Sequence, residues 1–368
     1  MLFDVFFYVF VFSVIIQLLY YIFLFGKFSF TKLEKTVPTT IPVSVIICVK
    51  NEAENLSIHL ESVLTQDHSN FEVIVVNDAS TDNTLSILNT FKKNYYNLKI
   101  VDIKPTTNYS GNKKNAVTKG IETATNNYLL FTDADCKSVS KNWITEMTSH
   151  FIEDKAIILG YGAYQKIKYS LLNKLIRYET LLTAIQYFSY AKADIPYMGV
   201  GRNLAYTKDV FNKANGFSNH THIRSGDDDL LINQVANKKN TTICFSKKSF
   251  TLSKPKKTLN TWFKQKRRHL TTANNYKPIH QFLLGVFYLS QFLFWLLAII
   301  LLAFSFKWQL VTILLIIRLT TQYIILGNSA RKLCEKDLII FFPMLDLILV
   351  TVQFGVYLSN LVSKPTSW

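Results

Sequence analysis

Hydrophobic residues are distributed in two ways, as long uninterrupted runs near both ends of the chain and as short runs in the middle. The first long run, residues 5–25, reads VFFYVFVFSVIIQLLYYIFLF and carries no charge. A spanning helix needs about 20 apolar residues, whereas the apolar core of a signal peptide usually has about 7–15. We therefore predict a transmembrane anchor in residues 1–26. Asp4 precedes the run and Lys27 and Lys32 follow it, which predicts an N-terminus outside and a cytosolic continuation.

Three further apolar stretches occupy the last third of the chain, at residues 281–306, 308–326 and 338–362. They predict three more spans within residues 281–362, with both chain termini outside. The second and third stretches contain one ionisable residue each, Arg318 and Asp346. A charge at the bilayer centre costs at least ~2.5–3.5 kcal/mol. We expect these two side chains to pair or to contact a lipid headgroup; the alternative is a shifted helix from which Arg318 snorkels.

The middle of the chain alternates short apolar runs with polar segments that favour helices. The runs are rich in β-branched residues and predict strands at residues 43–49, 71–76, 98–101 and 128–131. The segments between them predict helices at residues 53–64, 82–91 and 113–123. This alternation predicts an α/β domain with a mostly parallel sheet over residues 40–275. Ligands of such sheets bind beyond the carboxyl ends of the strands.

Polar residues are clustered after three of the predicted strands. Glu52 follows the first, Asp78 the second, and Asp133 and Asp135 the fourth. The last two flank a single small residue, so both carboxylates can face one hard cation, and Mg²⁺ or Mn²⁺ accepts carboxylates together with phosphate oxygens. An isolated aspartate could simply cap a helix, as Asp82 could here. Three clusters at successive strand ends instead favour a ligand site.

These motifs resemble those of a known family. The stretch VSVIICVKNEAENLSIHLESVLTQDHSNFEVIVVNDASTDNT is similar to the opening of the family 2 glycosyltransferases, and the resemblance extends over residues 43–269. It implies a GT-A fold, which is Rossmann-like with helices on both faces of the sheet, and transfer with inversion from a nucleotide sugar, usually UDP-linked, with Mg²⁺ or Mn²⁺ as cofactor.

The resemblance also implies roles for individual residues on the donor side. Glu52 and Asp78 match positions of the nucleotide pocket, and Asp133 and Asp135 match the DXD motif that holds the metal on the diphosphate. The segment GNKKNA is similar to the family's GK-x-x-A-L, so Lys114, or alternatively Lys113, is expected to reach a phosphate.

Two later motifs complete the resemblance. The segment SGDDDLL matches the place where the family has Glu-Asp, the Asp being the catalytic base. We predict Asp228 as this base, with Asp227 and Asp229 as alternatives. These acids could instead favour the start of a helix. In MGVGRNLA, Gly201 and Asn203 resemble the segment that lines the acceptor side.

The segment WFKQKRRH resembles the family motif Q-x-x-R-W. Gln265 and Arg268 match it and are expected at the donor, while His269 stands where the acceptor-side tryptophan is usual. In processive members that tryptophan stacks on the growing polymer. Its absence, together with only three C-terminal spans, disfavours processive synthesis.

Charge and cysteine content narrow the possible partners. Lys+Arg 41 against Asp+Glu 25 gives a net charge of +16. Lysines and arginines cluster between residues 254 and 268 among aromatic residues, which predicts an interfacial helix on anionic lipid. A second apolar periodicity, at residues 169–190, predicts either a core helix or a lining of the acceptor entrance. No nucleic-acid-binding module is recognisable, so nucleic acid is not an expected partner. The four cysteines lie far apart and fit a reducing compartment.

Taken together, the sequence predicts an integral membrane glycosyltransferase of a bacterial inner membrane with a cytosolic catalytic domain. It would move a sugar from a nucleotide-sugar donor to a lipid or lipid-linked glycan acceptor. Two alternatives stay open, a processive polysaccharide synthase and a non-catalytic membrane scaffold that retains the fold. The intact DXD and aspartate motifs disfavour the scaffold.

Overall fold

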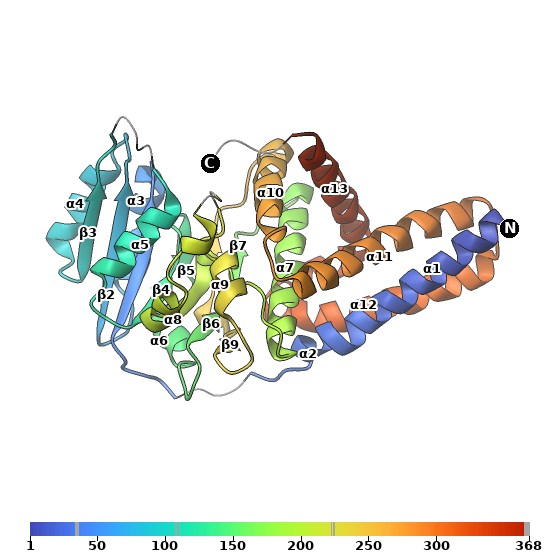
Figure 1. The fold of residues 1–368 in the computed structure, drawn as a ribbon, viewed down its shortest axis with the longest axis horizontal. Coiled ribbons are helices and arrows are strands. Elements are labelled where there is room, and N and C mark those ends of the chain that lie inside the picture. Colours follow the sequence, from blue (N-terminus) through green and yellow to red (C-terminus); the bar gives the residue numbers. More distant parts are fainter. Residues whose placement is uncertain (34–36, 107–108, 110, 222, 224, 364–368) are drawn as a thin grey trace. The chain divides into compact units, whose positions relative to one another are not determined.

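A computed structural model describes residues 1–33, 37–106, 109, 111–221, 223 and 225–363 (Figure 1). The chain divides into two compact units. The α/β unit contains the described residues of 33–165 and 194–255, and the membrane unit contains those of 1–32, 166–193 and 256–363.

The α/β unit alternates strands and helices along most of its length. Its strands are β1 (Val43–Val49), β2 (Phe71–Asp78), β3 (Leu98–Ile103), β4 (Tyr128–Phe131), β5 (Cys136–Ser138), β6 (Ile157–Leu159), β7 (Gly162–Tyr164), β8 (Leu204–Thr207), β9 (Thr241–Ile243) and β10 (Thr251–Ser253). Its helices are α3 (Ala53–Leu64), α4 (Thr84–Asn94), α5 (Lys113–Thr123), α6 (Trp143–Thr148), α8 (Lys208–Lys213) and α9 (Asp229–Val235), with short 3₁₀ turns η2 (Gly201–Asn203), η3 (Ser218–His220) and η4 (Lys247–Ser249).

A seven-stranded sheet with the order β3-β2-β1-β4-β8-β6-β9 forms the centre of this unit. The first four strands are parallel, β8 is antiparallel to β4 and β6, and β9 is parallel to β6. Strands β5, β10 and β7 form a second, smaller sheet. The chain moves outward from β1 to β3 and then returns to place β4 on the other side of β1. The strand order therefore reverses between β1 and β4, where open α/β sheets form their ligand crevice.

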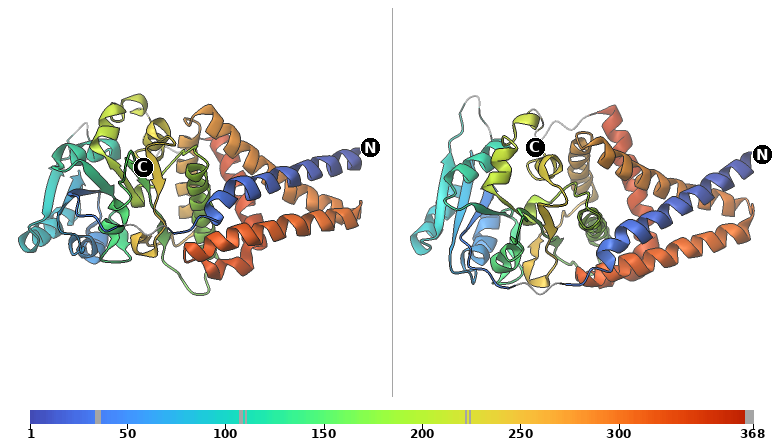
Figure 2. Two further views of the ribbon diagram at one scale, coloured as in Figure 1. Left: turned by 90° about the horizontal axis from the view of Figure 1, so that it is seen from below. Right: turned by 60° about the horizontal axis from the view of Figure 1, so that its bottom comes forward.

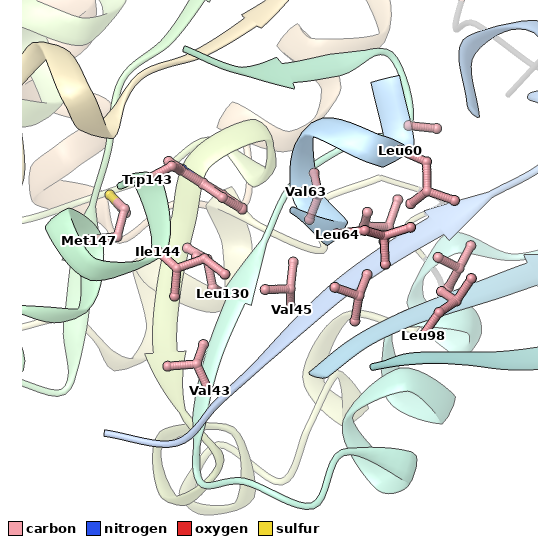
Figure 3. Close-up of a cluster of buried hydrophobic side chains, with 14 of the residues drawn as sticks. Val43, Val45, Leu60, Val63, Leu64, Leu98, Leu130, Trp143, Ile144 and Met147 are labelled. Carbon is pink, nitrogen blue, oxygen red and sulfur yellow. The ribbon is translucent and has the colours of Figure 1, made fainter. Parts of the chain in front are cut away.

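Both faces of the main sheet are covered by helices, which confirms the predicted fold class. Val43, Val45 and Ile47 face a core that contains side chains of α3 and α6 (Figure 3). On the opposite face α5 approaches closely, since a Cβ atom on Gly120 would lie 2.7 Å from Cγ2 of Ile46. Alternate β1 residues thus pack on opposite sides, which explains why the strand is apolar throughout.

The predicted element boundaries needed small corrections. Strands β2 and β3 run beyond residues 76 and 101 because their pairing continues through Asn77↔Asp102 and Asp78↔Ile103. Helix α4 begins at Thr84 rather than at residue 82, because the Asp82 carboxylate accepts a hydrogen bond from the Thr84 N–H at 3.0 Å.

The regular elements described in the membrane unit are all helices or helical turns. Its elements are α1 (Leu2–Leu19), the π-helical turn η1 (Tyr20–Phe25), α2 (Gly26–Ser29), α7 (Leu171–Lys192), α10 (Leu259–Ala273), α11 (Pro278–Ala303), α12 (Trp308–Lys332), the 3₁₀ turn η5 (Lys336–Phe341) and α13 (Phe342–Val362). In the described part of the chain four segments are long and apolar enough to span a membrane: Leu2–Ser29, Pro278–Ala303, Trp308–Lys332 and Lys336–Val362. Helix α1 lies along α11, with the Phe10 and Phe294 rings stacked 5.8 Å apart (Figure 2).

Arg318 and Asp346 form an ion pair inside this helical unit, which confirms the predicted pairing and replaces the snorkelling alternative. Nη2 of Arg318 lies 2.9 Å from Oδ2 of Asp346, and both side chains are 0% exposed. Tyr178 of α7 and Gln291 of α11 donate to Oδ1 of Asp346 at 2.8 and 2.6 Å. Trp295 donates to Oδ2 at 2.8 Å. The carboxylate therefore joins three helices of the unit to α13.

The guanidinium of Arg318 is similarly surrounded by polar groups. It donates to the side-chain oxygens of Gln17, Tyr21 and Gln322 at 3.1, 3.0 and 2.6 Å. Helix α7, which supplies Tyr178, has most of its residues buried. This burial favours the core-helix interpretation of the periodicity at residues 169–190.

Candidate active site

The carboxyl ends of β1 and β4 border a cavity at the point where the strand order reverses. It is partly open to solvent and is lined by Ile46, Cys48, Lys113, Val117, Phe131, Thr132, Asp133, Gly201, Leu204, Tyr206, Asp227 and Asp228. Apolar and aromatic residues make up much of this lining, and its charged residues include Lys113 with both of its ion-pair partners, Asp133 and Asp227. Such a combination is typical of small-molecule sites.

Lys113 links the acidic groups of this cavity. Its Nζ lies 3.2 Å from Oδ1 of Asp133, which follows β4, and 3.2 Å from Oδ2 of Asp227. Lys113 begins α5, and the side chain of Asn112 caps that helix by accepting from two backbone N–H groups. Burial disfavours the ammonium, but the carboxylates of Asp133, Asp227 and Asp228 outweigh it and hold the pKa of Lys113 well above its usual value. The lysine is therefore a fixed positive charge between the DXD motif and the second aspartate cluster.

Asp228 sits in the cavity with the properties of a general base. Its Oδ2 accepts from the Gly201 N–H at 2.6 Å and its Oδ1 accepts from the Asp229 N–H at 2.8 Å. Burial and the carboxylates of Asp227 and Asp229 raise the pKa of Asp228 from 3.8 to about 7. A base is most effective when its pKa lies near the working pH.

The three consecutive aspartates occupy different environments. Asp227 pairs with Lys113, and Asp228 lines the cavity with a raised pKa. Asp229 is buried at the start of α9, where its carboxylate accepts from the Leu230 N–H at 2.8 Å. The glycine at position 201 leaves room for the Asp228 carboxylate, since a Cβ atom there would lie 3.2 Å from Oδ2 of Asp228. Asp228 thus lines the cavity without the Lys113 ion pair of Asp227, and its role as base stays a prediction.

Asp78 lies at the end of β2 and offers an acceptor to a ligand. It is 2% exposed, and its Oδ1 accepts from the Tyr109 hydroxyl at 2.5 Å. Its Oδ2 is buried and has no hydrogen-bond partner among the residues that the structure describes. A Cβ atom on Gly111, which has φ +112°, would lie 3.0 Å from this oxygen. A buried unsatisfied acceptor is costly, so this oxygen suits a ligand hydroxyl or N–H group.

Glu52 lies directly after β1, in the loop that leads to α3. Its carboxylate accepts from Nδ2 of Asn55 at 2.6 Å, and its backbone N–H donates to Oγ1 of Thr84 at 3.0 Å. These bonds fix the β1–α3 loop against the start of α4.

The DXD carboxylates have the donor chemistry of a Mg²⁺ or Mn²⁺ site. Asp133 and Asp135 flank buried Ala134 and are themselves partly exposed. Within the described ranges no three His, Cys, Asp or Glu side chains come together to hold a metal. Mg²⁺ is usually bound by one or two carboxylates together with ligand phosphates, and Asp133 and Asp135 are two carboxylates of this kind.

Lys114, which we expected at a phosphate, does not line the cavity. Its side chain is 4% exposed, and its Nζ donates to the backbone oxygens of His220 and Ile223 at 2.6 and 2.8 Å. Burial lowers the pKa of Lys114 to about 8. The lysine holds the chain around η3, and the adjacent Lys113 takes the position at the cavity.

Asn203, expected on the acceptor side, also lies in the core. It is 0% exposed and accepts from Nε1 of Trp143 at 3.0 Å. Its Nδ2 donates to the backbone oxygens of Tyr161 and Ser249 at 3.0 and 2.7 Å. Both ends of the amide are used in packing, whereas its neighbour Gly201 reaches the cavity.

The residues of the variant Q-x-x-R-W motif belong to α10 of the membrane unit: Gln265, Arg268 and His269. Helix α10 is held within that unit by ion pairing of Lys266 with Glu179 at 2.7 Å and by donation from Arg267 to Asn360 at 2.9 Å. Oε1 of Gln265 is buried, with no hydrogen-bond partner in the described part of the chain. The roles of the three motif residues stay predictions.

Two family models match the chain. The model described as glycosyl transferase family 2 matches residues 44–213, and the model described as glycosyl transferase family group 2 matches residues 129–357. The second match alone spans more than half of the chain.

Named relatives match the chain over part of its length. The poly-beta-1,6-N-acetyl-D-glucosamine synthase of Staphylococcus epidermidis is 37% identical over 93 residues, which are 25% of this chain and 21% of the synthase. The UDP-Glc:alpha-D-GlcNAc-diphosphoundecaprenol beta-1,3-glucosyltransferase WfaP of Escherichia coli is 31% identical over 125 residues, 33% of this chain and 45% of that protein. The chain thus spans less than half of each of these relatives.

One solved structure is similar to the chain over almost its whole length. The mannosyltransferase PcManGT from Pyrobaculum calidifontis, in complex with GDP-Man and Mn²⁺, has a TM-score of 0.61 and 18% identity. The likeness covers 94% of this chain and 99% of that one. At this identity it is a likeness of fold.

Proposed function

The chain belongs to the family 2 glycosyltransferases, and from that premise we propose that it transfers a sugar, with inversion at C1, to a lipid or lipid-linked glycan acceptor. The observation that carries the proposal is Asp228, whose pKa is raised to about 7 in a cavity at the β1/β4 reversal. The acceptor hydroxyl gives its proton to the Asp228 carboxylate while its oxygen forms the bond to C1. The bond from C1 to the diphosphate breaks, and the nucleoside diphosphate leaves with the electron pair.

Positive charge is required on the donor side because the leaving diphosphate gains negative charge. A divalent ion held by Asp135 and Asp133 would act there as a Lewis acid. The Mn²⁺ in the PcManGT complex supports a metal of this kind. Gln265 and Arg268 of α10 are proposed to contact the donor as well, since a guanidinium binds phosphate bidentately.

The donor is proposed to be a UDP sugar bound at Asp78 and Glu52. The unpartnered Oδ2 of Asp78 would accept from the base or the ribose. UDP is preferred because the WfaP relative is named for a UDP-linked donor; the GDP-Man of the PcManGT complex makes GDP the competing choice.

The acceptor is proposed to be membrane-associated and to bind near Gly201 and His269. The α/β unit is proposed to be cytosolic at a bacterial inner membrane, with both chain termini outside. Four helical segments of membrane-spanning length in the described part of the chain support a lipid-borne acceptor, as does the diphosphoundecaprenol in the name of WfaP.

A processive polysaccharide synthase is the second candidate, favoured by the relative from S. epidermidis. The histidine at position 269, in place of tryptophan, disfavours it.

The test is a screen of UDP and GDP sugars with purified protein in detergent, Mn²⁺ or Mg²⁺ and a bacterial lipid extract. We expect release of one nucleoside diphosphate and single-sugar addition to a lipid, both lost in Asp135→Ala. A long homopolymer would favour the synthase, and donor binding without turnover would favour a scaffold.

A further inference from the structure

Arg202 lies next in sequence to a residue of the cavity lining, and hydrogen bonds hold its backbone in place. It follows Gly201, whose N–H donates to the Asp228 carboxylate at 2.6 Å. The hydroxyls of Thr132, at the end of β4, and Thr251, in β10, both donate to the Arg202 backbone oxygen, at 3.1 and 2.9 Å. Two segments of the α/β unit that are far apart in sequence therefore fix this residue.

The side chain of Arg202 is held as firmly as its backbone. Its guanidinium carbon lies 4.3 Å from the centroid of the Tyr164 ring, and Nη1 donates to Oγ of Ser253 at 3.3 Å. Gly162 provides the space, since a Cβ atom there would lie 3.1 Å from Cβ of Arg202. A stacked guanidinium loses little rotamer freedom when it binds a ligand.

The charge of Arg202 is not neutralised directly. Among the described residues no carboxylate lies within 4.0 Å of its guanidinium, and Ser253 is the side chain to which it donates. Lys113 differs, because Asp133 and Asp227 neutralise it. Burial disfavours the charged form of Arg202, but nearby groups that include Asp135 and Asp133 favour it, and its pKa ends above the usual value. Arg202 is thus a permanent cation whose charge the DXD carboxylates favour and with which no described carboxylate forms an ion pair.

We propose that Arg202 binds a phosphate oxyanion of a substrate. The inference rests on the proposed function, which it deepens by adding a residue that recognises phosphate. A guanidinium is suited to this because two of its N–H groups can bind two oxygens of one phosphate. The oxyanion is either the diphosphate of the donor or the phosphate of a lipid-linked acceptor.

The experiment measures phosphate binding separately from turnover. Arg202→Met keeps an apolar stem against Tyr164 but removes the charge, and Arg202→Lys restores a charge without the bidentate donors. Arg331→Gln is the matched control, because Arg331 is exposed and donates only to Asn328 of its own helix in the described part of the chain. Binding of UDP, GDP and inorganic pyrophosphate to the full-length protein is measured by calorimetry with Mn²⁺, and thermal melting checks folding.

If the oxyanion belongs to the donor, Arg202→Met should weaken nucleoside diphosphate and pyrophosphate binding roughly 10- to 100-fold, with partial recovery in Arg202→Lys and no change in Arg331→Gln. If it belongs to the acceptor, those affinities stay unchanged. The KM for a polyprenyl-diphosphate-linked acceptor then rises by a similar factor, and the KM for a phosphate-free glycolipid does not.

Unchanged affinities together with an unchanged acceptor KM would overturn the inference, as would losses that only follow the loss of folded protein. A wild-type protein that turned over no nucleotide sugar would refute the proposed function instead. In that case calorimetry with pyrophosphate and with the polyprenyl-diphosphate-linked acceptor decides on Arg202, and equal affinity of wild type and Arg202→Met for both would refute it.

Discussion

Removing one partner of the Arg318–Asp346 pair should destabilise the membrane unit much more than replacing both partners. In Asp346→Leu the guanidinium of Arg318 stays 0% exposed and loses its only anionic partner among the described residues. Breaking a buried ion pair in this way typically costs about 3–5 kcal/mol. Tyr178, Gln291 and Trp295 also lose the carboxylate to which they donate, and each orphaned donor costs about 1–3 kcal/mol. These costs are not additive, so we take about 3–5 kcal/mol as the lower bound for the loss of unfolding free energy in Asp346→Leu.

The double variant Arg318→Leu/Asp346→Leu leaves no buried charge. Replacing a buried pair with apolar residues is often neutral, so the double variant should be more stable than either single variant. Since each single variant costs at least about 3 kcal/mol and the double variant less than either, the coupling energy between the two positions should be at least about 3 kcal/mol, at or above the upper end of values for residues in contact. Gln17, Tyr21 and Gln322 lose the guanidinium in this variant, so full wild-type stability is not expected.

Unfolding in mixed detergent micelles, followed by tryptophan fluorescence, measures these differences. Thr320→Leu is the control, because Thr320 is exposed on the same helix and gains a similar apolar side chain. The control should stay close to wild type. A double variant no more stable than the worse single variant would refute the pairing as the source of stability, and so would single variants that unfold like wild type.

Three further predictions concern the α/β unit. If deprotonated Asp228 is the base, as proposed, kcat/KM should rise with pH around 7. Asp227→Asn should move this limb of the pH–rate profile to lower pH and Lys113→Met should move it to higher pH, and identical profiles would contradict the assignment. The folded-state pKa of Asp228 lies above its ordinary 3.8, so stability from this group is lost as pH rises towards 7. Asp228→Asn should therefore raise the melting temperature more at pH 8 than at pH 5, and an equal shift at both would count against burial as the cause. Gly111→Ala would place a Cβ atom 3.0 Å from Oδ2 of Asp78 and would strain a backbone with φ +112°. This substitution should raise the donor KM at least about tenfold. An unchanged donor KM would show that this oxygen does not face the nucleotide.

The parts of the fold with strong periodicity were predictable from sequence. β1, β4 and α3 have the predicted boundaries because a buried strand is apolar throughout and polar residues end it on both sides. The three-residue strands β5, β6, β7, β9 and β10 were missed, since so short a segment carries no usable period. The antiparallel β8 was also missed, because the direction of a strand depends on its partners across the sheet.

Sequence also placed the acidic motifs at strand ends but could not rank neighbouring residues. Lys113 and Lys114 are adjacent and chemically alike, yet one faces the cavity and the other binds backbone oxygens around η3. The distinction depends on how α5 is rotated against the sheet. Arg202 carried no signal of its own, because Tyr164 and Ser253, which hold its guanidinium, are distant in sequence.

The most direct test of the central claim compares Asp228→Asn with Asp229→Asn in a single-turnover assay of sugar transfer. Both variants remove one carboxylate from the same segment, but Asp228 lines the cavity and Asp229 caps α9. We expect Asp228→Asn to lower the transfer rate by about 10²–10⁴-fold, the range of general base catalysis, with donor binding retained and Asp229→Asn far less affected. Equal rates for Asp228→Asn and wild type would contradict the assignment of the base and the mechanism built on it.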